Sequence, residues 1–386
     1  MKFLHTSDLH IGKKLDGFSR LDEQSEVLTE ISNIAQSENV DAVLIAGDVF
    51  DTFMPSSNAE NLFFEFLDLL TQKGIVTVAI AGNHDDEDRL TASKALASRR
   101  GAFLCGADNN FNLGRYGKLD LIETGNNYIV FKGDNETCFI ATVPYFGEAP
   151  KGYEIDKEKT YGEKVGDLLE EIFSRKKEEY TAILLSHLFM LGGQTTEGER
   201  SIDLGGAKVV SPNAIPKCVK YTALGHLHKR QSASKSGNVI YSGAPLQYSY
   251  DEVGNEKSVT VFSVINGEIK DLKTVSLNSG RKLCKLSVSG IESADVILSK
   301  YPDNFIDFTI FSDRPLAVEE TAKLKEKYPY ITKLKLELLS NNDGDRITGR
   351  KHLSDKELFV EFIKEKYGKE PDEELMSAYL EIIAEE

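Results

Sequence analysis

The sequence contains no tryptophan, only four cysteines and no long uninterrupted apolar segment. None of its apolar runs approaches the roughly 18 residues that a membrane-spanning helix requires. Polar side chains at His5, Asp8 and His10 interrupt any signal-peptide core near the start of the chain. The cysteines lie far apart and form no C-x-x-C pair, which is typical of reduced thiols in a cytosol. We therefore expect a cytoplasmic protein.

The sequence also lacks a G-x-x-x-x-G-K-S/T phosphate-binding loop, an internal repeat and a low-complexity tract. Any dependence on ATP must therefore come from another protein. The formal net charge of −16 argues against tight unaided binding of nucleic acid by the whole surface, because Lys and Arg supply most of the non-specific affinity. Basic side chains do occur near the motifs described next, at Lys13, Lys14, Arg89, Lys229 and Arg230. They indicate either a local basic site or ordinary solvated charges, and the sequence favours neither.

Eight polar side chains in five short segments are candidates for a metal site. The segments are S-D-L-H, A-G-D-V-F-D, A-G-N-H-D, S-H and G-H-L-H, and the side chains are Asp8, His10, Asp48, Asn83, His84, His187, His226 and His228. This mixture of carboxylate, carboxamide and imidazole suits two divalent cations about 4 Å apart, with one carboxylate bridging them. No cysteine belongs to the set, and an all-nitrogen-and-oxygen ligand field favours Mn, Fe or Zn. The segments therefore predict a dinuclear metal site.

Each of these segments follows an apolar run that we expect to form a buried strand. The runs are residues 3–5, 42–46, 75–81, 182–185 and 221–224. In open α/β sheets, reactive groups gather outside the carboxyl ends of the strands, so segments far apart in the chain can meet there. Gly47, Gly82 and Gly225 directly precede candidate ligands, where the missing Cβ atom permits close backbone approach. By contrast, His5 and His352 are better explained as packing or solvated residues.

Residues 1–275 alternate apolar strands with amphipathic stretches such as 24–37 and 58–72, which predicts a layered α/β core. Short strands dominate the second half of this region. We expect them at residues 117–132, 137–143, 238–242, 258–264 and 268–275. Turn signals such as Asn266-Gly267 are typical of hairpins. These strands predict a second sheet that faces the first.

Three further regions follow this core. Residues 279–339 predict a small separate domain in which three strands alternate with two helices. The polar residues 340–352 are typical of a flexible linker. Residues 353–386 predict two helices, the first starting at the capping box S-D-K-E and the second after Pro371. The apolar face of this tail either packs back on the main body or binds a partner, and the pattern favours neither.

The ordered motifs D-x-H, G-D, G-N-H-D, H and G-H-x-H resemble the signature of the metallophosphoesterase family. Further similarity in A-G-D-V-F-D-T, A-L-G-H-L-H and Y-S-G-A-P-L-Q-Y-S extends to its SbcD branch, the nuclease subunits of bacterial DNA repair. The resemblance is dense from residue 1 to about residue 262 and looser afterwards. It implies a four-layer α/β sandwich, in which helices flank two facing β-sheets. Residues 279–339 would be a capping domain, and residues 353–386 would bind a partner.

The resemblance also implies roles for the candidate residues. One metal would take Asp8, His10, Asp48 and His228, and the other would take Asp48, Asn83, His187 and His226. Asp48 would be the bridge, which agrees with the two oxygens of a carboxylate. His84 would be a catalytic group that steadies the transition state or protonates the leaving oxygen. The implied cofactor is a pair of divalent ions, with Mn²⁺ expected first and Fe²⁺ or Zn²⁺ as alternatives.

One position departs from part of the family. Archaeal and eukaryotic relatives carry a second catalytic histidine three residues after the bridging aspartate, whereas this sequence has Asp51 there, as bacterial members do. Asp51 either binds a water at the metals or caps the following turn. We favour capping.

The implied activity is that of a DNA exonuclease on double-stranded ends and an endonuclease on hairpins. Such nucleases act with an SbcC-type coiled-coil ATPase in double-strand break repair, recombination and replication, and the ATPase would dock on residues 353–386. A phosphodiesterase for a small or cyclic ester is the alternative, although the extra domain and tail argue against it. A non-catalytic scaffold is a third possibility, and the complete ligand set argues against that.

The resemblance finally implies a homodimer. Residues 58–70 and 88–97 match the helices by which relatives pair. The first of these segments carries an apolar stripe, formed by Leu62, Phe63, Phe66 and Leu70. Packing in the core of a single chain explains this stripe equally well.

Overall fold

The computed structural model describes residues 1–147, 158–196 and 208–339, together with single positions at 360, 364, 371, 375 and 376. The predicted linker, residues 340–352, lies outside the described residues, and so does the predicted helical segment, residues 353–386, apart from these five positions. The chain divides into a large compact unit, residues 1–310 and 317–335, and a small one, residues 311–316 and 336–386. All elements below belong to the large unit except the ends of β20 and β21.

A six-stranded sheet carries the first three candidate segments. Its strands, in spatial order, are β18 (Glu268–Ser276), β17 (Ser258–Ile265), β1 (Lys2–Thr6), β4 (Ala42–Ala46), β5 (Val76–Ile80) and β6 (Ala102–Cys105). Strands β1, β4, β5 and β6 are parallel to one another. β17 runs antiparallel to β1, and β18 antiparallel to β17. The carboxyl ends of β1, β4 and β5 therefore lie along one edge of this sheet.

An eight-stranded sheet carries the other two segments. Its strands, in spatial order, are β15 (Gln231–Ser232), β16 (Val239–Tyr241), β14 (Val219–Gly225), β11 (Thr181–His187), β10 (Thr137–Val143), β9 (Tyr128–Lys132), β8 (Leu119–Gly125) and β7 (Gly114–Tyr116). β16, β14, β11 and β10 are parallel, and the flanking strands are antiparallel. Two small pairs lie beside these sheets, β2 (Lys14–Leu15) with β3 (Phe18–Ser19) and β12 (Phe189–Met190) with β13 (Val209–Val210).

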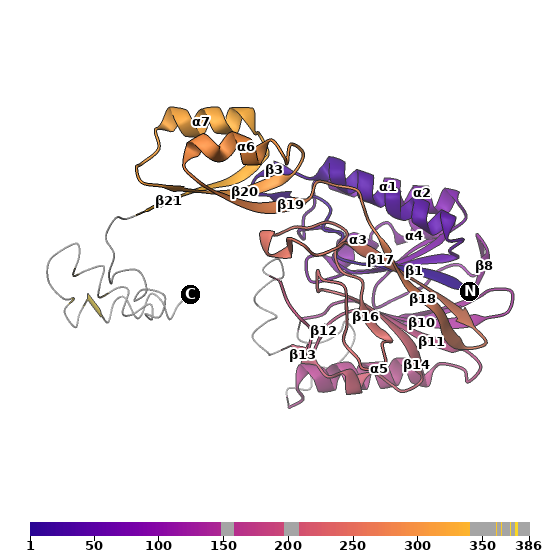
Figure 1. Ribbon diagram of the computed structural model, residues 1–386. Helices are drawn as coiled ribbons and strands as arrows, with labels where there is room; N and C mark the ends of the chain where they lie inside the picture. The colour runs from indigo at the N-terminus through magenta and orange to yellow at the C-terminus, as the bar shows by residue number, and fades with distance from the viewer. Residues whose placement is uncertain are drawn as a thin grey trace. The chain divides into compact units, whose positions relative to one another are not determined.

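The two sheets face each other and are covered by helices on their outer sides (Figure 1). The outer face of the six-stranded sheet packs on α1 (Leu21–Ser37) and α2 (Ser57–Gln72). The outer face of the eight-stranded sheet packs on α5 (Tyr161–Ser174). This arrangement of helix, sheet, sheet and helix confirms the predicted four-layer α/β sandwich.

Strand periodicity explains why both faces of the first sheet are apolar. In β4, Val43 and Ile45 point to the helices, whereas Ala42, Leu44 and Ala46 point to the space between the sheets. Successive side chains of a strand alternate between faces, so a strand buried on both sides must be apolar throughout. Between the sheets, Phe262 stacks on Phe3 and on Tyr221 of the facing sheet, with ring centroids 5.2 and 3.9 Å apart.

The helices begin and end where local chemistry favours it. The Ser56 side chain accepts the Ala59 N–H and caps α2, and Thr160 with Glu163 forms a capping box for α5. Two short helices, α3 (Glu87–Thr91) and α4 (Lys94–Ala97), lie between β5 and β6. The Asp86 side chain caps α3 by accepting the Arg89 N–H.

Residues 279–339 contain the predicted alternation of strands and helices. A three-stranded sheet consists of β19 (Leu283–Ser289), β20 (Phe305–Ser312) and β21 (Ile331–Leu338), with α6 (Ala294–Leu298) and α7 (Val318–Lys327) between the strands. Leu283 and Phe305 are buried together with Leu15 and Tyr250 in a small apolar cluster. The Arg20 guanidinium lies 5.0 Å from the centroid of the Phe305 ring.

One expectation from the sequence needs correction, and one alternative that the sequence left open is resolved. The hairpin of β17 and β18 does not join the second sheet, because β17 pairs with β1 and extends the first. The successive residues Val261 and Phe262 of β17 point to opposite faces and fill the two apolar cores on either side of that sheet. The stripe on α2 is also settled: Leu62, Phe63, Phe66 and Leu70 are buried against the first sheet, so core packing accounts for it.

Among the described residues, no helix is both long enough and apolar enough to cross a membrane.

Candidate metal centre

The eight candidate side chains lie at the carboxyl ends of five neighbouring strands in the two facing sheets. Asp8 and His10 follow β1, Asp48 follows β4, and Asn83 with His84 follows β5. His187 is the last residue of β11, and His226 with His228 follows β14. Because β4 contacts both β11 and β14 across the space between the sheets, all five strand ends reach one place.

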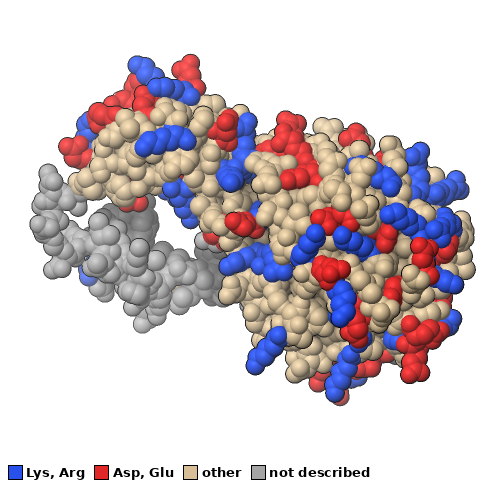
Figure 2. Space-filling view, turned by 45° about the vertical axis from the view of Figure 1, so that its right-hand side comes forward, with Lys and Arg blue, Asp and Glu red and all other residues tan. Residues whose placement is uncertain are grey.

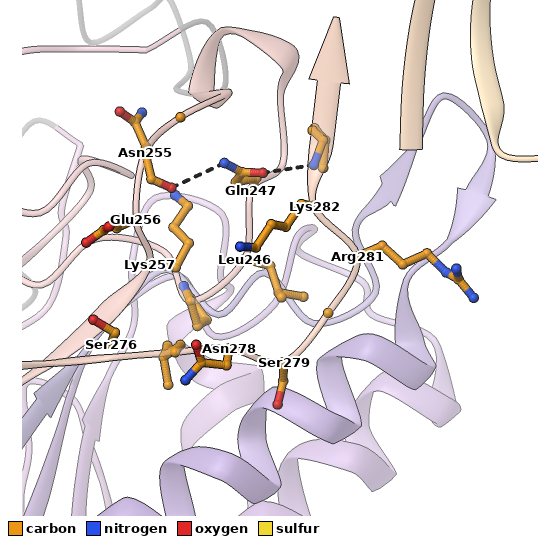
Figure 3. A pocket seen from close by; sticks show the side chains of 15 residues that line it. Leu246, Gln247, Asn255, Glu256, Lys257, Ser276, Asn278, Ser279, Arg281 and Lys282 are labelled. Atoms are coloured by element: carbon orange, nitrogen blue, oxygen red, sulfur yellow. Dashed lines mark hydrogen bonds between the residues drawn. The ribbon is translucent and has the colours of Figure 1, made fainter. Parts of the chain in front are cut away.

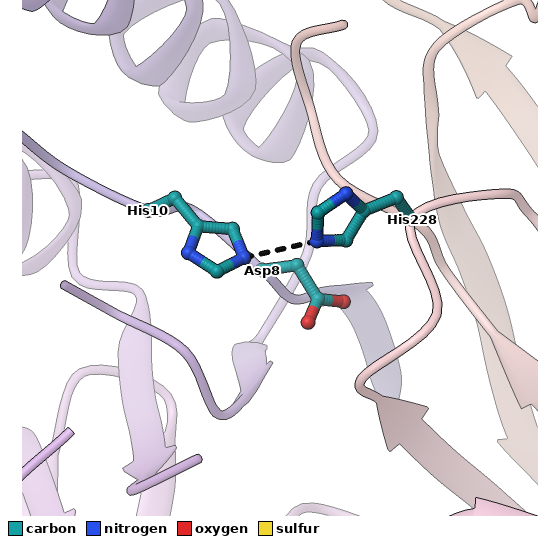
Figure 4. Close-up of side chains that lie close together, drawn as sticks. All are labelled: Asp8, His10 and His228. Carbon is teal, nitrogen blue, oxygen red and sulfur yellow. Dashed lines mark hydrogen bonds between the residues drawn. The ribbon is translucent and has the colours of Figure 1, made fainter. Parts of the chain in front are cut away.

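The side chains form overlapping clusters of buried donor atoms. Three groups each place one donor atom per residue within 4.8 Å of the others: Asp8 with His10 and His228, Asp8 with Asp48 and His187, and His10 with Asp48 and His84. Figure 4 shows the first group, in which the Nε2 atoms of His10 and His228 are 3.0 Å apart beside Asp8. All of these residues are buried. The structure therefore brings the predicted residues together, and their individual roles stay predictions.

Asn83 and Asp48 connect these clusters. The Asn83 Oδ1 atom lies 2.9 Å from His187 Nε2 and 3.0 Å from His226 Nδ1. One oxygen of Asp48, Oδ2, lies 3.6 Å from His10 Nε2 and 3.4 Å from His187 Nε2. Asp48 thus stands between the two sets of donors that the family resemblance assigns to separate ions. A bridging carboxylate needs this position.

The backbone at the centre is unusual. Asp8, His10, Asp48 and His226 all have positive φ, with values of 52°, 43°, 49° and 104°. Residues with a Cβ atom rarely adopt this region, and such strained positions concentrate at functional sites. The loop after β1 runs beside the loop after β4, with the Asp8 and His10 N–H groups donating to the Gly47 and Asp48 carbonyls at 3.0 Å. These backbone bonds hold Asp8, His10 and Asp48 next to one another.

The three glycines before ligands leave no room for a side chain. A Cβ atom on Gly82 would collide with the carboxylate and backbone nitrogen of Asp48. One on Gly225 would collide with the Ala46 carbonyl oxygen, and one on Gly47, whose φ is +84°, with the His187 ring. The predicted close backbone approach is confirmed at all three positions.

The sequence prediction missed two further residues at the centre, Asp85 and Glu252. Asp85 accepts backbone N–H groups from Val49, Phe50 and Gly82 at 2.8–3.0 Å, and so ties the loop after β4 to the loop after β5. The motif G-N-H-D contains Asp85 and could have pointed to it. Glu252 lies fully buried with Oε1 3.5 Å from His228 Nδ1. No sequence signal marks Glu252, because it lies outside the segments that supply the candidate ligands.

Asp51 does not have the predicted capping role. Its carboxylate accepts a hydrogen bond from Lys13 Nζ at 2.8 Å and lies 3.5 Å from His10 Nδ1, while Ser56 caps the next helix. The Asp51 backbone carbonyl lies 2.8 Å from His84 Nδ1. Since a carbonyl can only accept, His84 Nδ1 carries the proton. Capping was wrong because the loop turns Asp51 back toward the centre.

Charges at the centre are arranged for a cation. Burial raises the pKa of Asp8 to about 6. It lowers the pKa values of His10 and His226 to about 3, so these two imidazoles are uncharged at pH 7 and can offer a lone pair to a cation. Burial also opposes a charge on His187, but Asp48 and Asp8 outweigh it and raise its pKa to about 9. For Glu252, burial is outweighed by His228 and Lys257, which lower the pKa to about 2.

The donors present fit a pair of divalent ions. His226 Nε2 is buried and has no hydrogen-bond partner among the described residues, although buried polar atoms are normally satisfied. His187 Nδ1, by contrast, has an outward partner, the Ala46 carbonyl oxygen at 2.8 Å. Metal-ligating histidines are commonly held in this way, with the second nitrogen on a carbonyl or carboxylate.

Among the described residues, the remaining histidine, His5, and two of the basic residues near the motifs have other partners. His5 Nδ1 lies 3.0 Å from the Tyr221 hydroxyl and Nε2 lies 3.1 Å from the Leu224 carbonyl oxygen, as expected for a packing residue. Lys13 pairs with Asp51, and Arg89 pairs with Glu60. Figure 2 shows Lys and Arg interspersed with Asp and Glu over the displayed face. The nearby cations are therefore partly neutralised.

Comparisons with known proteins agree with this geometry. Residues 1–230 match the family described as calcineurin-like phosphoesterase. The chain is 35% identical to the SbcD component of the nuclease SbcCD from Bacillus subtilis strain 168, over 99% of this chain and 97% of that protein. Proteins of the same name in Staphylococcus epidermidis and Rhodobacter capsulatus are 28% and 33% identical, over 94% and 69% of this chain and 93% and 67% of their own lengths.

Replacing Gly82 by Ala is expected to weaken metal binding by about 100-fold or more, because the new methyl group displaces the Asp48 carboxylate. Titration with Mn²⁺, followed by electron paramagnetic resonance of the free ion, measures the loss. Gly133→Ala is the matched control. The φ of Gly133 is not in the left-handed region, and a Cβ atom there would lie 3.4 Å from its nearest neighbour, the Met1 side chain. Equal affinities of the two variants would contradict the proposed packing at Gly82.

Metal affinity is expected to rise with pH between about 6 and 9. Below its pKa of about 9, His187 holds a proton that an incoming cation must displace, which costs up to tenfold in affinity per pH unit. Below about 6, protonation of Asp8 steepens the loss. Calorimetric titration in buffers of different ionisation enthalpy should show close to one proton released at pH 7.5. An affinity that is flat across this range would contradict the expectation that the metal displaces a proton from His187.

Proposed function

This chain belongs to the calcineurin-like phosphoesterases and, within that family, to the SbcD proteins of the SbcCD nucleases, and from this premise we propose that it is a metal-dependent DNA nuclease. It hydrolyses phosphodiester bonds at the centre formed by the five strand ends. The observation that supports this function best is the position of Asp48 between two buried sets of nitrogen and oxygen donors.

We propose the ligand division that the family resemblance implies. Asp8, His10, Asp48 and His228 hold one ion, and Asp48, Asn83, His187 and His226 hold the other. Mn²⁺ is the proposed metal, with Fe²⁺ and Zn²⁺ as the alternatives for this donor set. When bound, the two ions supply Lewis acidity toward the phosphate oxygens and a hydroxide nucleophile at neutral pH.

The protein's own groups position the phosphate and supply the catalytic proton. His84 donates its backbone N–H to Asp48 Oδ1 at 2.8 Å, and its ring is held through Nδ1 by the Asp51 carbonyl. With Nδ1 fixed as a donor, Nε2 is the atom that exchanges the catalytic proton. His84, when protonated on Nε2 as well as on Nδ1, gives the Nε2 proton to the leaving sugar oxygen, or stabilises negative charge on the phosphate through that N–H, without binding either ion.

The proposal also includes the DNA substrates and the partner protein. The enzyme acts as an exonuclease on double-stranded ends and as an endonuclease on hairpins, in the cytoplasm, in repair, recombination and replication of DNA. It works with an SbcC-type coiled-coil ATPase that docks on residues 353–386, and residues 279–339 form the capping domain. A partner that holds the DNA reconciles a nuclease with its net charge of −16.

Asp48→Ala is expected to abolish Mn²⁺-dependent cleavage of a blocked-end DNA hairpin, because both ions lose their shared ligand. His84→Asn should keep two metal equivalents but lower the cleavage rate by roughly 10²–10⁴-fold. The assay is run with and without the ATPase and ATP. Asp108→Ala, an exposed aspartate with 74% of its side-chain surface accessible, is the control that should change nothing.

Two results would overturn the assignment. Cleavage by Asp48→Ala at the rate of the unsubstituted enzyme would refute the two-metal mechanism. Faster turnover of a small aryl phosphodiester than of the hairpin, with the ATPase present, would favour the small-ester phosphodiesterase instead.

We also propose a homodimer, formed through the outer face of α2 and α4. The buried stripe of α2 is unavailable, but Phe64 and Leu96 are 39% and 69% exposed and border an apolar hollow that also includes Leu67 and Ala97. Sedimentation velocity at micromolar concentration should show a dimer that Phe64→Glu/Leu96→Glu converts to a monomer, because two carboxylates would be desolvated at the interface. A monomer before substitution would disprove pairing through this surface.

A further inference from the structure

A buried ion pair lies behind one of the candidate metal ligands. Glu252 is fully buried, and its carboxylate pairs through Oε2 with Lys257 Nζ. Its other oxygen, Oε1, accepts the Tyr248 N–H at 3.1 Å and lies 3.5 Å from His228 Nδ1. Glu252 belongs to the loop between β16 and β17, outside every motif that supplies a ligand.

This ion pair grips His228 at two points. Lys257 Nζ, besides pairing with Glu252, donates to the His228 backbone carbonyl at 3.0 Å. The ring is therefore contacted by the carboxylate and the backbone by the ammonium group. The opposite ring nitrogen, His228 Nε2, points into the centre, 3.0 Å from His10 Nε2.

The loop that carries Glu252 is itself fixed. Gln247 Nε2 donates to the carbonyls of Glu252 and Asn255 at 2.9 and 3.2 Å, and Gln247 Oε1 accepts the Leu283 N–H at 3.0 Å. Figure 3 shows Gln247 making the bonds to Asn255 and to the start of β19, with Lys257 beside them. A carboxylate on so constrained a loop has a defined position relative to the imidazole.

Stability alone does not explain a fully buried carboxylate here. Burying two charges costs free energy that the attraction between them only partly returns, so such pairs are often no better than apolar packing. A carboxylate behind a metal-ligating imidazole, in contrast, holds the outer N–H, directs the lone pair of the other nitrogen to the metal and raises the ligand's basicity. Asp51 and Lys13 repeat the arrangement behind His10, which belongs to the same cluster.

We propose that Glu252 is a positioning residue for the metal held by Asp8, His10, Asp48 and His228, and that Lys257 is the counter-ion that keeps it in place. This inference rests on the proposed function. Glu252 holds the proton of His228 on Nδ1, so that Nε2 presents its lone pair to the ion. It touches neither ion nor substrate.

The test is a Mn²⁺ titration of the full chain, followed by electron paramagnetic resonance. Glu252→Gln is expected to weaken one of the two metal equivalents by about 10–100-fold and to reduce the spin-coupled signal of the pair, while the other equivalent keeps its affinity. Glu252→Asp should recover part of this loss. Asp307→Asn is the control, because it removes another buried carboxylate paired with a lysine, Lys335, outside the centre.

A second variant separates positioning from folding. Glu252→Gln leaves Lys257 buried without its counter-ion, which by itself lowers the melting temperature. Glu252→Gln/Lys257→Met removes both charges and should restore the melting temperature but not the metal affinity. If the affinity returns together with the melting temperature, or if Glu252→Gln binds both equivalents normally, the proposal is wrong.

Failure of the proposed function would look different. The unsubstituted protein is titrated first, and binding of fewer than two equivalents would count against the dinuclear centre itself. With two equivalents bound, any result for Glu252→Gln bears on Glu252 alone.

Discussion

The centre depends on one contact, the close approach of the loop after β4 to the loop after β5. The Asp85 carboxylate maintains it by accepting N–H groups from both loops, and Gly82 permits it because no Cβ atom fits against Asp48. Asp48 can lie between two sets of donors only while this contact holds. The parallel strands bring the two loops to the same edge of the sheet. The contact between the loops then sets the position of the Asp48 carboxylate.

The centre is built at the expense of local stability. Four candidate ligands have positive φ, and each strained residue costs of order 1–3 kcal/mol. Carboxylates and imidazoles are buried side by side, which adds a desolvation cost. Two extensive apolar cores on either side of the first sheet, and a third behind the second, offset these costs. A rigid sandwich is thus the condition for holding unfavourable groups close together.

Much of this could be predicted from the sequence, because the information was local. Apolar runs of the right length ended directly before polar ligands, so strand ends and candidate donors were visible together, and the glycines between them marked the tight approach. The predictions that were wrong or missing concerned contacts between residues far apart in the chain. Nothing near Ser258–Ile265 shows that this strand pairs with β1. Glu252 and Asp51 owe their positions to Lys257 and Lys13, and such pairings leave no periodicity or motif to detect.

The pairing of β1 with β17 has a consequence for biosynthesis. The first candidate ligand, Asp8, is synthesised early, yet its strand β1 gains its second neighbour only when Ser263 has been made, 255 residues later (263 − 8). At roughly 5–20 residues per second, this takes roughly 13–50 s. During that interval β1 lacks the β17 neighbour, and the set of candidate donors stays incomplete until His228 has been made. A chain that ends before His228 would lack one ligand of the proposed pair of ions, so the proposed metal centre can form only late in synthesis.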